Sequence, residues 1–375
     1  MFSIHQRKLN LVETAILLIS YICWSHAAFT DTIISHPIRQ QRLSRQNDCL
    51  QSNSISWENI VDRCYLITCP SANGGKERFD RSMAVLNEVG LMKVNRDGKD
   101  FTFIKEFEVD EEDRIRGCYT SHINVLKEGF QALKKNRNGN TNNILVIEDN
   151  VAVTDGVDRE EALRQIYAFL NSPSSASSTA IDVIHMSYIA YVPNLTVTKT
   201  NLSNIVKLNS GIGSSLGTTA YLISLDAIEA LLKEDKEKGY YGAAIPDVMA
   251  DLFAESRYST YPVPFHRASN VKSLVNPQLD SLREILFEPT ILLKVQAMLA
   301  ETGLSTNTLL FLTIGLLVSL STSSLRIAFD AFSQILRTGA YDGVIIFPLV
   351  CSCFGLFSLA IIAQGIALAP KQEEA

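Results

Sequence analysis

The stretch Asn143-Ile-Leu-Val-Ile-Glu-Asp-Asn150 decides the fold of this chain. Its four consecutive apolar residues are mostly β-branched, which predicts a strand buried on both faces of a largely parallel sheet. Glu148, Asp149 and Asn150 follow directly. Ligands of open α/β sheets bind outside the carboxyl ends of the strands, where hard cations prefer carboxylate and amide oxygens. The stretch therefore predicts a metal site at these three residues, although acidic residues in such a place also suit a helix cap or solvent.

Strands and helices alternate around this stretch. Apolar residues at helical spacing predict a helix over 77–89, which Gly90 ends. Further helices are expected at 121–135 (with Ser121 as a possible cap), 158–170 and 226–238, further strands at 64–69, 181–186 and 219–224, and a short helix with Pro246 in its first turn. This alternation predicts an α/β sandwich with a mostly parallel sheet.

Composition limits the classes of function. The chain has 375 residues, enough for one large domain or two smaller ones, and a formal net charge of −6. With no basic patch in its central region, nucleic acid is not an expected partner. The four cysteines outside the apolar ends are Cys49, Cys64, Cys69 and Cys118. They would form two disulfides in an oxidising compartment or act as small buried thiols elsewhere.

Apolar residues concentrate at both ends of the chain. Residues 9–28 follow Arg7 and Lys8, as in a secretory signal peptide or signal anchor. The uncharged apolar runs 308–325 and 343–369 are long enough to cross a bilayer. The predicted division is a signal or anchor (1–28), a presequence or linker (29–58), the main domain (59–287), a linker or interfacial helix (288–306), a transmembrane helix (307–326), a loop (327–342), a second transmembrane helix (343–369) and a tail (370–375).

The same features predict a location. Arg326 and Arg337 favour a cytosolic loop between the two spans, which leaves the main domain in the lumen of the secretory pathway, in the endoplasmic reticulum or Golgi. The glycosylation sequons at Asn194 and Asn201 agree with a luminal domain. An alternative is a plastid membrane of an alga with secondary plastids, because the stretch after Phe29 contains Arg and Ser and few acidic residues.

Several blocks of the sequence occur in the order and spacing of one enzyme family. They are Gly117-Cys-Tyr-Thr-Ser-His122, Ile147-Glu-Asp-Asn-Val151, Asp182-Val-Ile184, Gly217-Thr-Thr-Ala-Tyr-Leu-Ile-Ser224 and Ile245-Pro-Asp-Val248. Over roughly residues 62–268 the chain thus resembles glycosyltransferase family 25, which includes lipooligosaccharide and collagen galactosyltransferases.

The resemblance implies a GT-A fold, a Rossmann-type α/β/α sandwich. It also implies a nucleotide-sugar donor, with UDP-galactose first, a divalent metal such as Mn²⁺, and a glycan, glycoprotein or glycolipid acceptor. The reaction would be hexosyl transfer with inversion. The two apolar spans near the C-terminus are not part of the family's usual layout, and we expect them to tether the enzyme to a membrane. The residues it assigns are Glu148, Asp149 and Asn150 to the metal, Arg78, Ser121, His122 and Asp149 to the donor, and Asp247 to catalysis as the general base.

Other roles remain open for some of these residues. Asp247 also suits the charge of a helix N-terminus, Ser121 a helix cap, and Arg78 an exposed helix position. The sequence departs from the family at Asn150, where a third acidic residue is usual, and at the loop that contains Gly74 and Gly75. The alternative function is therefore a catalytically silent family member that serves as a binding or scaffold protein.

Overall fold

The computed structural model describes residues 55–93, 100–135, 141–172, 181–190, 192, 194–202, 204–209, 216–268, 271 and 289–338. The chain divides into two compact units, one of residues 32–305 and one of residues 1–31 together with 306–375. The predicted signal segment, the predicted second span and the tail lie outside the described residues.

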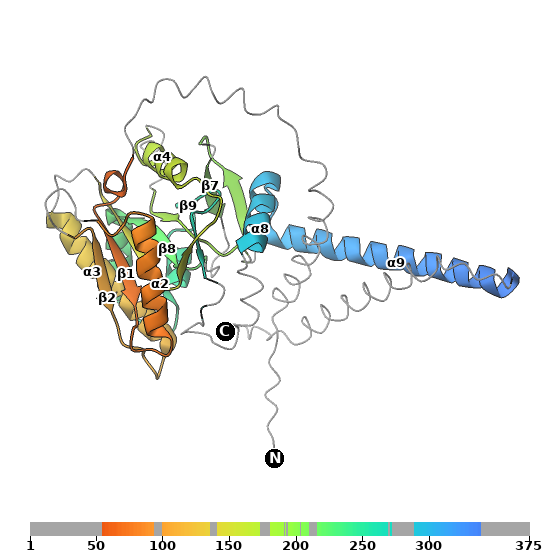
Figure 1. Cartoon of the computed structure of the whole chain (residues 1–375), viewed down its shortest axis with the longest axis horizontal. Coiled ribbons are helices and arrows are strands. Elements are labelled where there is room, and N and C mark those ends of the chain that lie inside the picture. The colour runs from red at the N-terminus through yellow and green to blue at the C-terminus, as the bar shows by residue number, and fades with distance from the viewer. Residues whose placement is uncertain are drawn as a thin grey trace, which may run out of the picture. The chain divides into compact units, whose positions relative to one another are not determined.

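A mixed sheet of eight strands forms the centre of the described part of unit 32–305 (Figure 1). Its spatial order is β2 (Thr102–Glu106), β1 (Arg63–Thr68), β3 (Asn143–Glu148), β8 (Ala220–Ser224), β5 (Val183–His185), β9 (Arg257–Thr260), β7 (Ile205–Asn209) and β6 (Thr196–Lys199). Only β8 and β7 run against the direction that the other strands share. The sheet is therefore mixed and mostly parallel. Strands β4 (Val151–Val153) and β10 (Phe265–Arg267) form a separate antiparallel pair.

Helices cover both faces of the sheet. Side chains of α2 (Gly75–Glu88) and α4 (Arg159–Leu170) share one apolar core with Leu145 and Ile147 of β3. Side chains of α3 (Arg114–Lys135), α5 (Leu225–Lys238) and α6 (Ile245–Leu252) share a second core with Ile144 and Val146. Strand β3 is thus buried on both faces, and the predicted α/β/α sandwich is confirmed.

The strand register places the carboxyl ends of β1 and β3 and the start of β8 at the same edge of the sheet. Strands β1 and β3 are parallel, with Ile67 opposite Glu148, so the residues that follow both strands lie side by side. Strand β8 is antiparallel to β3 and begins with Ala220 opposite Ile147. The residues before β8 therefore meet those after β3 at this carboxyl edge.

One helix boundary differs from the prediction. Helix α3 begins at Arg114, well before the expected start at Ser121. Its first turns are polar and contain Gly117, so they show little of the apolar periodicity that marks a helix in sequence. By contrast, Asp158 caps α4 as expected, since its carboxylate accepts a hydrogen bond of 3.0 Å from the backbone N–H of Glu161.

Helix α8 (Pro289–Thr302) occupies the segment that was expected to be a linker or interfacial helix. Leu292, Val295, Gln296 and Leu299 are buried, and Gln296 Nε2 donates a hydrogen bond of 3.0 Å to the backbone carbonyl of Tyr188. This helix therefore packs on the α/β unit.

Helix α9 (Thr306–Thr338) belongs to the other unit and corrects the division expected there. It runs without a break through the predicted span 307–326 and into the predicted loop 327–342. The reason is local, because residues 316–338 contain neither Gly nor Pro and Gly339 follows directly. Among the described residues, no helix combines the length and apolar character needed to cross a membrane.

Candidate functional site

A cavity of about 390 Å³ lies at the carboxyl edge of β1 and β3. This volume is within the range that small-molecule sites occupy. Residues from distant parts of the chain line it, and they include every site residue predicted from the sequence: Arg78, Ser121, His122, Glu148, Asp149, Asn150 and Asp247. The structure therefore brings the whole predicted set to one place.

Two glycines place Arg78 at this edge. Gly74 has a φ of 73°, a left-handed conformation that glycine adopts without strain. A Cβ on Gly75 would lie 2.1 Å from the carbonyl oxygen of Cys69, so only glycine permits the close approach between the chain after β1 and the start of α2. The loop that departs from the family pattern is thus a tight turn, and it puts Arg78 in the first turns of α2 beside the end of β1.

Asp149 is held by donors from the end of β1 and from α2. Its Oδ2 accepts hydrogen bonds from Thr68 Oγ1 at 2.9 Å, from the Cys69 N–H at 3.3 Å and from Arg78 Nη2 at 3.1 Å. Burial raises the pKa of Asp149, and the opposing charge of Arg78 only partly compensates. The predicted donor-site residues Arg78 and Asp149 are therefore partners in one buried ion pair.

Glu148 belongs to a different network. Its Oε1 accepts a hydrogen bond from the Thr218 hydroxyl and lies 3.3 Å from His122 Nε2, while its Oε2 accepts one of 2.8 Å from Asn150 Nδ2. Burial alone would raise the pKa of Glu148, but His122, the Thr218 hydroxyl and the charge of Arg267 together lower it to about 2. Glu148 is thus an ionised carboxylate at neutral pH.

Ser121 and His122 lie inside α3. Ser121 Oγ donates a hydrogen bond of 2.8 Å to the carbonyl of Gly117, so Ser121 does not cap the helix. His122 Nδ1 lies 2.9 Å from the Tyr221 hydroxyl, and the two rings stack with centroids 5.9 Å apart. These contacts fix the imidazole of His122 with its Nε2 toward Glu148.

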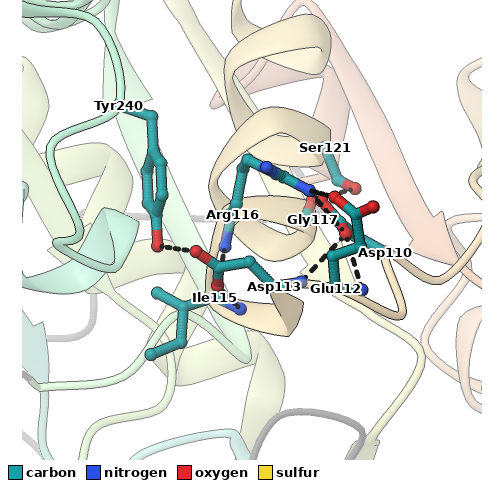
Figure 2. Close-up of polar contacts among 8 residues, drawn as sticks. All are labelled: Asp110, Glu112, Asp113, Ile115, Arg116, Gly117, Ser121 and Tyr240. Atoms are coloured by element: carbon teal, nitrogen blue, oxygen red, sulfur yellow. Dashed lines mark hydrogen bonds and ion pairs between the residues drawn. The ribbon is translucent and has the colours of Figure 1, made fainter.

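An acidic turn caps α3, and Figure 2 shows its polar contacts. Asp113 Oδ1 accepts hydrogen bonds of 3.0 Å from the N–H groups of Ile115 and Arg116, and its Oδ2 accepts one of 2.8 Å from the Tyr240 hydroxyl. Asp110 pairs with Arg116 at 2.6 Å, and the hydrogen bond from Arg116 is the largest cause that lowers the pKa of Asp110 to about 2. This turn is therefore the N-terminal cap of α3.

Gly117 links that cap to the cavity, which it lines. A Cβ at this position would lie 2.8 Å from the Cβ of Asp110. The first turns of α3 therefore require a glycine where the acidic turn crosses them.

Asp247 lies in the first turn of α6, where Pro246 occupies an early helical position as predicted. Its carboxylate is half-buried and lines the cavity. Burial, together with the nearby charge of Asp251, raises the pKa of Asp247. A carboxylate with a raised pKa is a stronger base than an ordinary aspartate, as long as it stays ionised.

The cavity also contains residues that the sequence analysis missed. Arg267, at the end of β10, and Leu292, in α8, line it, and so do Thr218 and Tyr188. No motif or periodicity in the sequence identifies Arg267 as a site residue. It lies at the site because β10 pairs with β4, which places Arg267 opposite Val151. Of these four residues, only Thr218 belongs to one of the blocks that resemble glycosyltransferase family 25. It lies just before β8.

Four buried polar atoms of residues that line the cavity lack a hydrogen-bond partner among the described residues. They are Arg78 Nε, His122 Nε2, Asn150 Oδ1 and the Tyr188 hydroxyl. For His122 the 3.3 Å approach to Glu148 is an ion-pair distance without hydrogen-bond alignment. Unsatisfied buried donors and acceptors are costly, so atoms of this kind gathered around a cavity indicate a polar ligand.

The predicted metal ligands do not form one ligand set. Neighbouring side chains at a strand end point in different directions, which sends Glu148 toward His122 and Asp149 toward Arg78. Asn150 turns its NH₂ group to Glu148. Within the part of the chain that the structure describes, no three His, Cys, Asp or Glu side chains form a group that could hold a metal ion. The residues present therefore do not fit the expected cation.

The three cysteines within the described residues are free thiols, and Cys49 lies outside them. Cys69 and Cys118 line the cavity. Burial raises the pKa of Cys69 to about 11, so it is protonated at neutral pH. Between the two alternatives left open by the sequence, these three residues take the role of small, partly or fully buried thiols.

Comparison with known proteins finds structural similarities among solved structures. No family model matches the chain, and no curated protein matches its sequence. Among solved structures it is similar to a glycosyltransferase involved in the glycosylation of the major capsid of PBCV-1. The two share 12% sequence identity, the match covers 60% of this chain and 99% of that one, and the TM-score is 0.29. A similarity at this level does not indicate a function.

Proposed function

We propose that the chain is a glycosyltransferase that moves a hexose, with galactose as the first candidate, from a UDP-sugar to a hydroxyl of a glycan, glycoprotein or glycolipid, with inversion. One observation carries the proposal. Four of the five blocks that resemble glycosyltransferase family 25 are far apart in the sequence, yet each contributes residues to a single cavity at the carboxyl edge of the sheet. That edge is where α/β folds bind ligands.

The polar atoms of the cavity suit a nucleotide sugar. Arg78 Nε and His122 Nε2 are buried donor positions, and Asn150 Oδ1 is a buried acceptor. Phosphate oxygens accept from guanidinium groups, frequently in bidentate geometry, while sugar hydroxyls donate to amide oxygens. A ligand with both a diphosphate and hydroxyl groups would satisfy all three atoms.

Asp247 is the proposed catalytic base. In an inverting transfer the acceptor oxygen attacks the anomeric carbon, the bond from that carbon to the diphosphate oxygen breaks, and UDP leaves with the bonding electrons. The acceptor hydroxyl must lose its proton as the new bond forms, and a carboxylate within the cavity can take it. The raised pKa of Asp247 supports this role, because it increases the affinity of the carboxylate for that proton.

We also propose that the enzyme is tethered to a membrane of the secretory pathway, with the α/β unit in the lumen, and that the plastid membrane is the alternative. The support is the apolar sequence at the two ends of the chain and the exposure of Asn194 and Asn201, which begin the two sequons. Glycan attached at either asparagine in the native protein would rule out the plastid alternative.

The decisive experiment is calorimetric titration of the purified full-length chain with UDP-galactose and UDP-glucose, combined with an assay of UDP release. We expect saturable binding and slow hydrolysis of the donor. Asp247→Asn should keep binding and lose UDP release, whereas Asp226→Asn, on the neighbouring helix α5, should change neither. A folded protein that binds no nucleotide sugar would refute the enzyme and leave the scaffold alternative.

A further inference from the structure

A sugar transferase that releases UDP must neutralise the charge that develops on the diphosphate. Divalent cations or arginine side chains can do this. The family resemblance implies a cation, held by Glu148, Asp149 and Asn150. The cavity contains both the residues expected to hold a cation and two arginines. The contacts that these side chains make show which of the two can neutralise the diphosphate.

Three of the four carboxylate oxygens of Glu148 and Asp149 accept hydrogen bonds from protein donors. Both oxygens of Glu148 are engaged, one by the Thr218 hydroxyl near His122 and the other by the Asn150 amide. Asp149 receives three donors on Oδ2, one of them the buried guanidinium of Arg78. A cation would have to displace Arg78 or approach it closely, and both cost free energy in a buried site.

Asn150 contributes no charge where an acidic residue would contribute one. A carboxylate in its place would face Glu148 across the 2.8 Å contact that the amide now makes as a donor. Two carboxylates so close would repel unless a cation lay between them. The amide removes both the repulsion and the reason for a cation.

Two arginines supply positive charge at the same cavity. Arg78 is 8% exposed, and its Nε has no partner among the described residues although its Nη2 binds Asp149. Arg267 is the last residue of β10, far from Arg78 in the sequence, and it also lines the cavity. A guanidinium presents donors in a rigid fork that matches phosphate oxygens.

We propose that Arg78 and Arg267 bind and neutralise the diphosphate of the donor, and that the site works without a divalent cation. In the free protein Asp149 acts as a substitute anion for Arg78. When the diphosphate binds, Arg78 turns donors to the phosphate oxygens, while Asp149 keeps its bonds to Thr68 and to the Cys69 N–H. This inference rests on the proposed function and specifies how its donor site works.

The test is titration of the full-length chain with UDP in excess EDTA and again in millimolar Mn²⁺. We expect dissociation constants that agree within about twofold, because the positive charge is part of the protein. Binding that occurs only with Mn²⁺ would overturn the inference and leave the glycosyltransferase intact. Absence of UDP binding in both buffers would instead refute the proposed function itself.

Substitutions separate charge at the phosphates from effects on folding. Arg78→Gln and Arg267→Gln should each weaken metal-free UDP binding by about tenfold or more, because each removes charged donors. Both should leave the binding of uridine, which has no phosphate, unchanged. Arg81→Gln, in the same helix as Arg78 but paired with Glu77 at the surface, is the matched control and should bind UDP normally. Equal losses for uridine and UDP would indicate a structural role and overturn the inference.

Asp149→Asn should change UDP binding in opposite directions, depending on whether arginine or a cation binds the phosphates. If arginine binds the phosphates, removal of the competing carboxylate charge should tighten UDP binding in EDTA by several-fold, to about tenfold. If a cation binds there, the same substitution removes a ligand and should abolish binding. Loss of binding in Asp149→Asn would therefore refute the inference even if the single arginine variants behave as expected.

Discussion

Asp149 Oδ2 and Arg78 Nη2 lie 3.1 Å apart, with each side chain less than one-tenth exposed, in the wall of the cavity. Residues 71 positions apart in the sequence thus form one buried ion pair at the end of β1. Loss of one partner from such a pair leaves an uncompensated charge.

This ion pair predicts a specific pattern of stability. Arg78→Met should lower the free energy of unfolding by about 3 kcal/mol, because it leaves the Asp149 carboxylate buried without its cation. Adding Asp149→Asn should recover at least about 1 kcal/mol, since the amide still accepts from Thr68 and Cys69 and carries no charge. Urea unfolding of the two single variants and the double variant measures the coupling. Additive losses would show that the pair does not couple.

Gly117 should not tolerate a side chain. Gly117→Ala places a Cβ 2.8 Å from the Cβ of Asp110 and should destabilise the protein by about 1–3 kcal/mol, as overpacking does elsewhere. Gly315→Ala is the matched control, since its Cβ meets nothing within 4 Å in a helix interior, and it should be neutral or stabilising. Thermal unfolding of both variants tests the contrast, and equal stability would contradict it.

His185 should make the protein sensitive to mild acid. Burial, and to a lesser degree the charge of Arg257, lower the pKa of His185 to about 3 from its ordinary 6.5. Below pH 6.5 the unfolded chain binds a proton that the folded chain does not, so stability falls with pH. The loss from this residue should reach about 2 kcal/mol at pH 5. His185→Leu should remove that slope in urea unfolding measured from pH 7 to pH 5.

Glu148 should also make stability depend on pH, but at lower pH than His185, and through its contact with His122. Its pKa is lowered from 4.5 to about 2, so its ionised form stabilises the fold above pH 4.5 and this contribution disappears as pH falls toward 2. Glu148→Gln should therefore be less stable than the natural protein at pH 6, by about 3 kcal/mol, and nearly equal to it near pH 2. A stability difference that stays constant over this range would show that ionisation is not its cause.

Asp247 should control the rate and its dependence on pH. Asp247→Asn should lower kcat by at least about 100-fold and leave the affinity for UDP unchanged, as expected for a general base. The charge of Asp251 contributes to the raised pKa of Asp247, so Asp251→Asn should move the acidic limb of the rate profile to lower pH. An unchanged limb would mean that another group provides the base.

The sequence predicted the parts of the structure that depend on neighbouring residues. Strand β3 was recognisable because its apolar run has no polar face, and α4 because Asp158 stands directly before an amphipathic segment. Helix α3 was recognised too late, since Gly117 and the charged residues around it conceal its first turns. Strands β4 and β10 were not predicted, and neither were the longer strands β2, β6, β7 and β9.

In the site, too, some residues were predicted from the sequence and others were not. The resemblance to glycosyltransferase family 25 implied that Arg78, His122, Asp149 and Asp247 belong to one site, and the structure places all four in the cavity. Arg267 could not be predicted, since it reaches the cavity through one antiparallel pairing over more than a hundred residues of chain.

By itself, the sequence determined the alternation of elements, the buried central strand and the set of polar residues at its end, because these follow from local periodicity and turn chemistry. Only the tertiary structure decided which partner each carboxylate takes. Glu148 and Asp149 are adjacent in the chain, yet one faces His122 and the other Arg78. Hydrogen bonds and charge act through space, so the packing of α2 and α3 against the sheet sets the chemistry of these two neighbours.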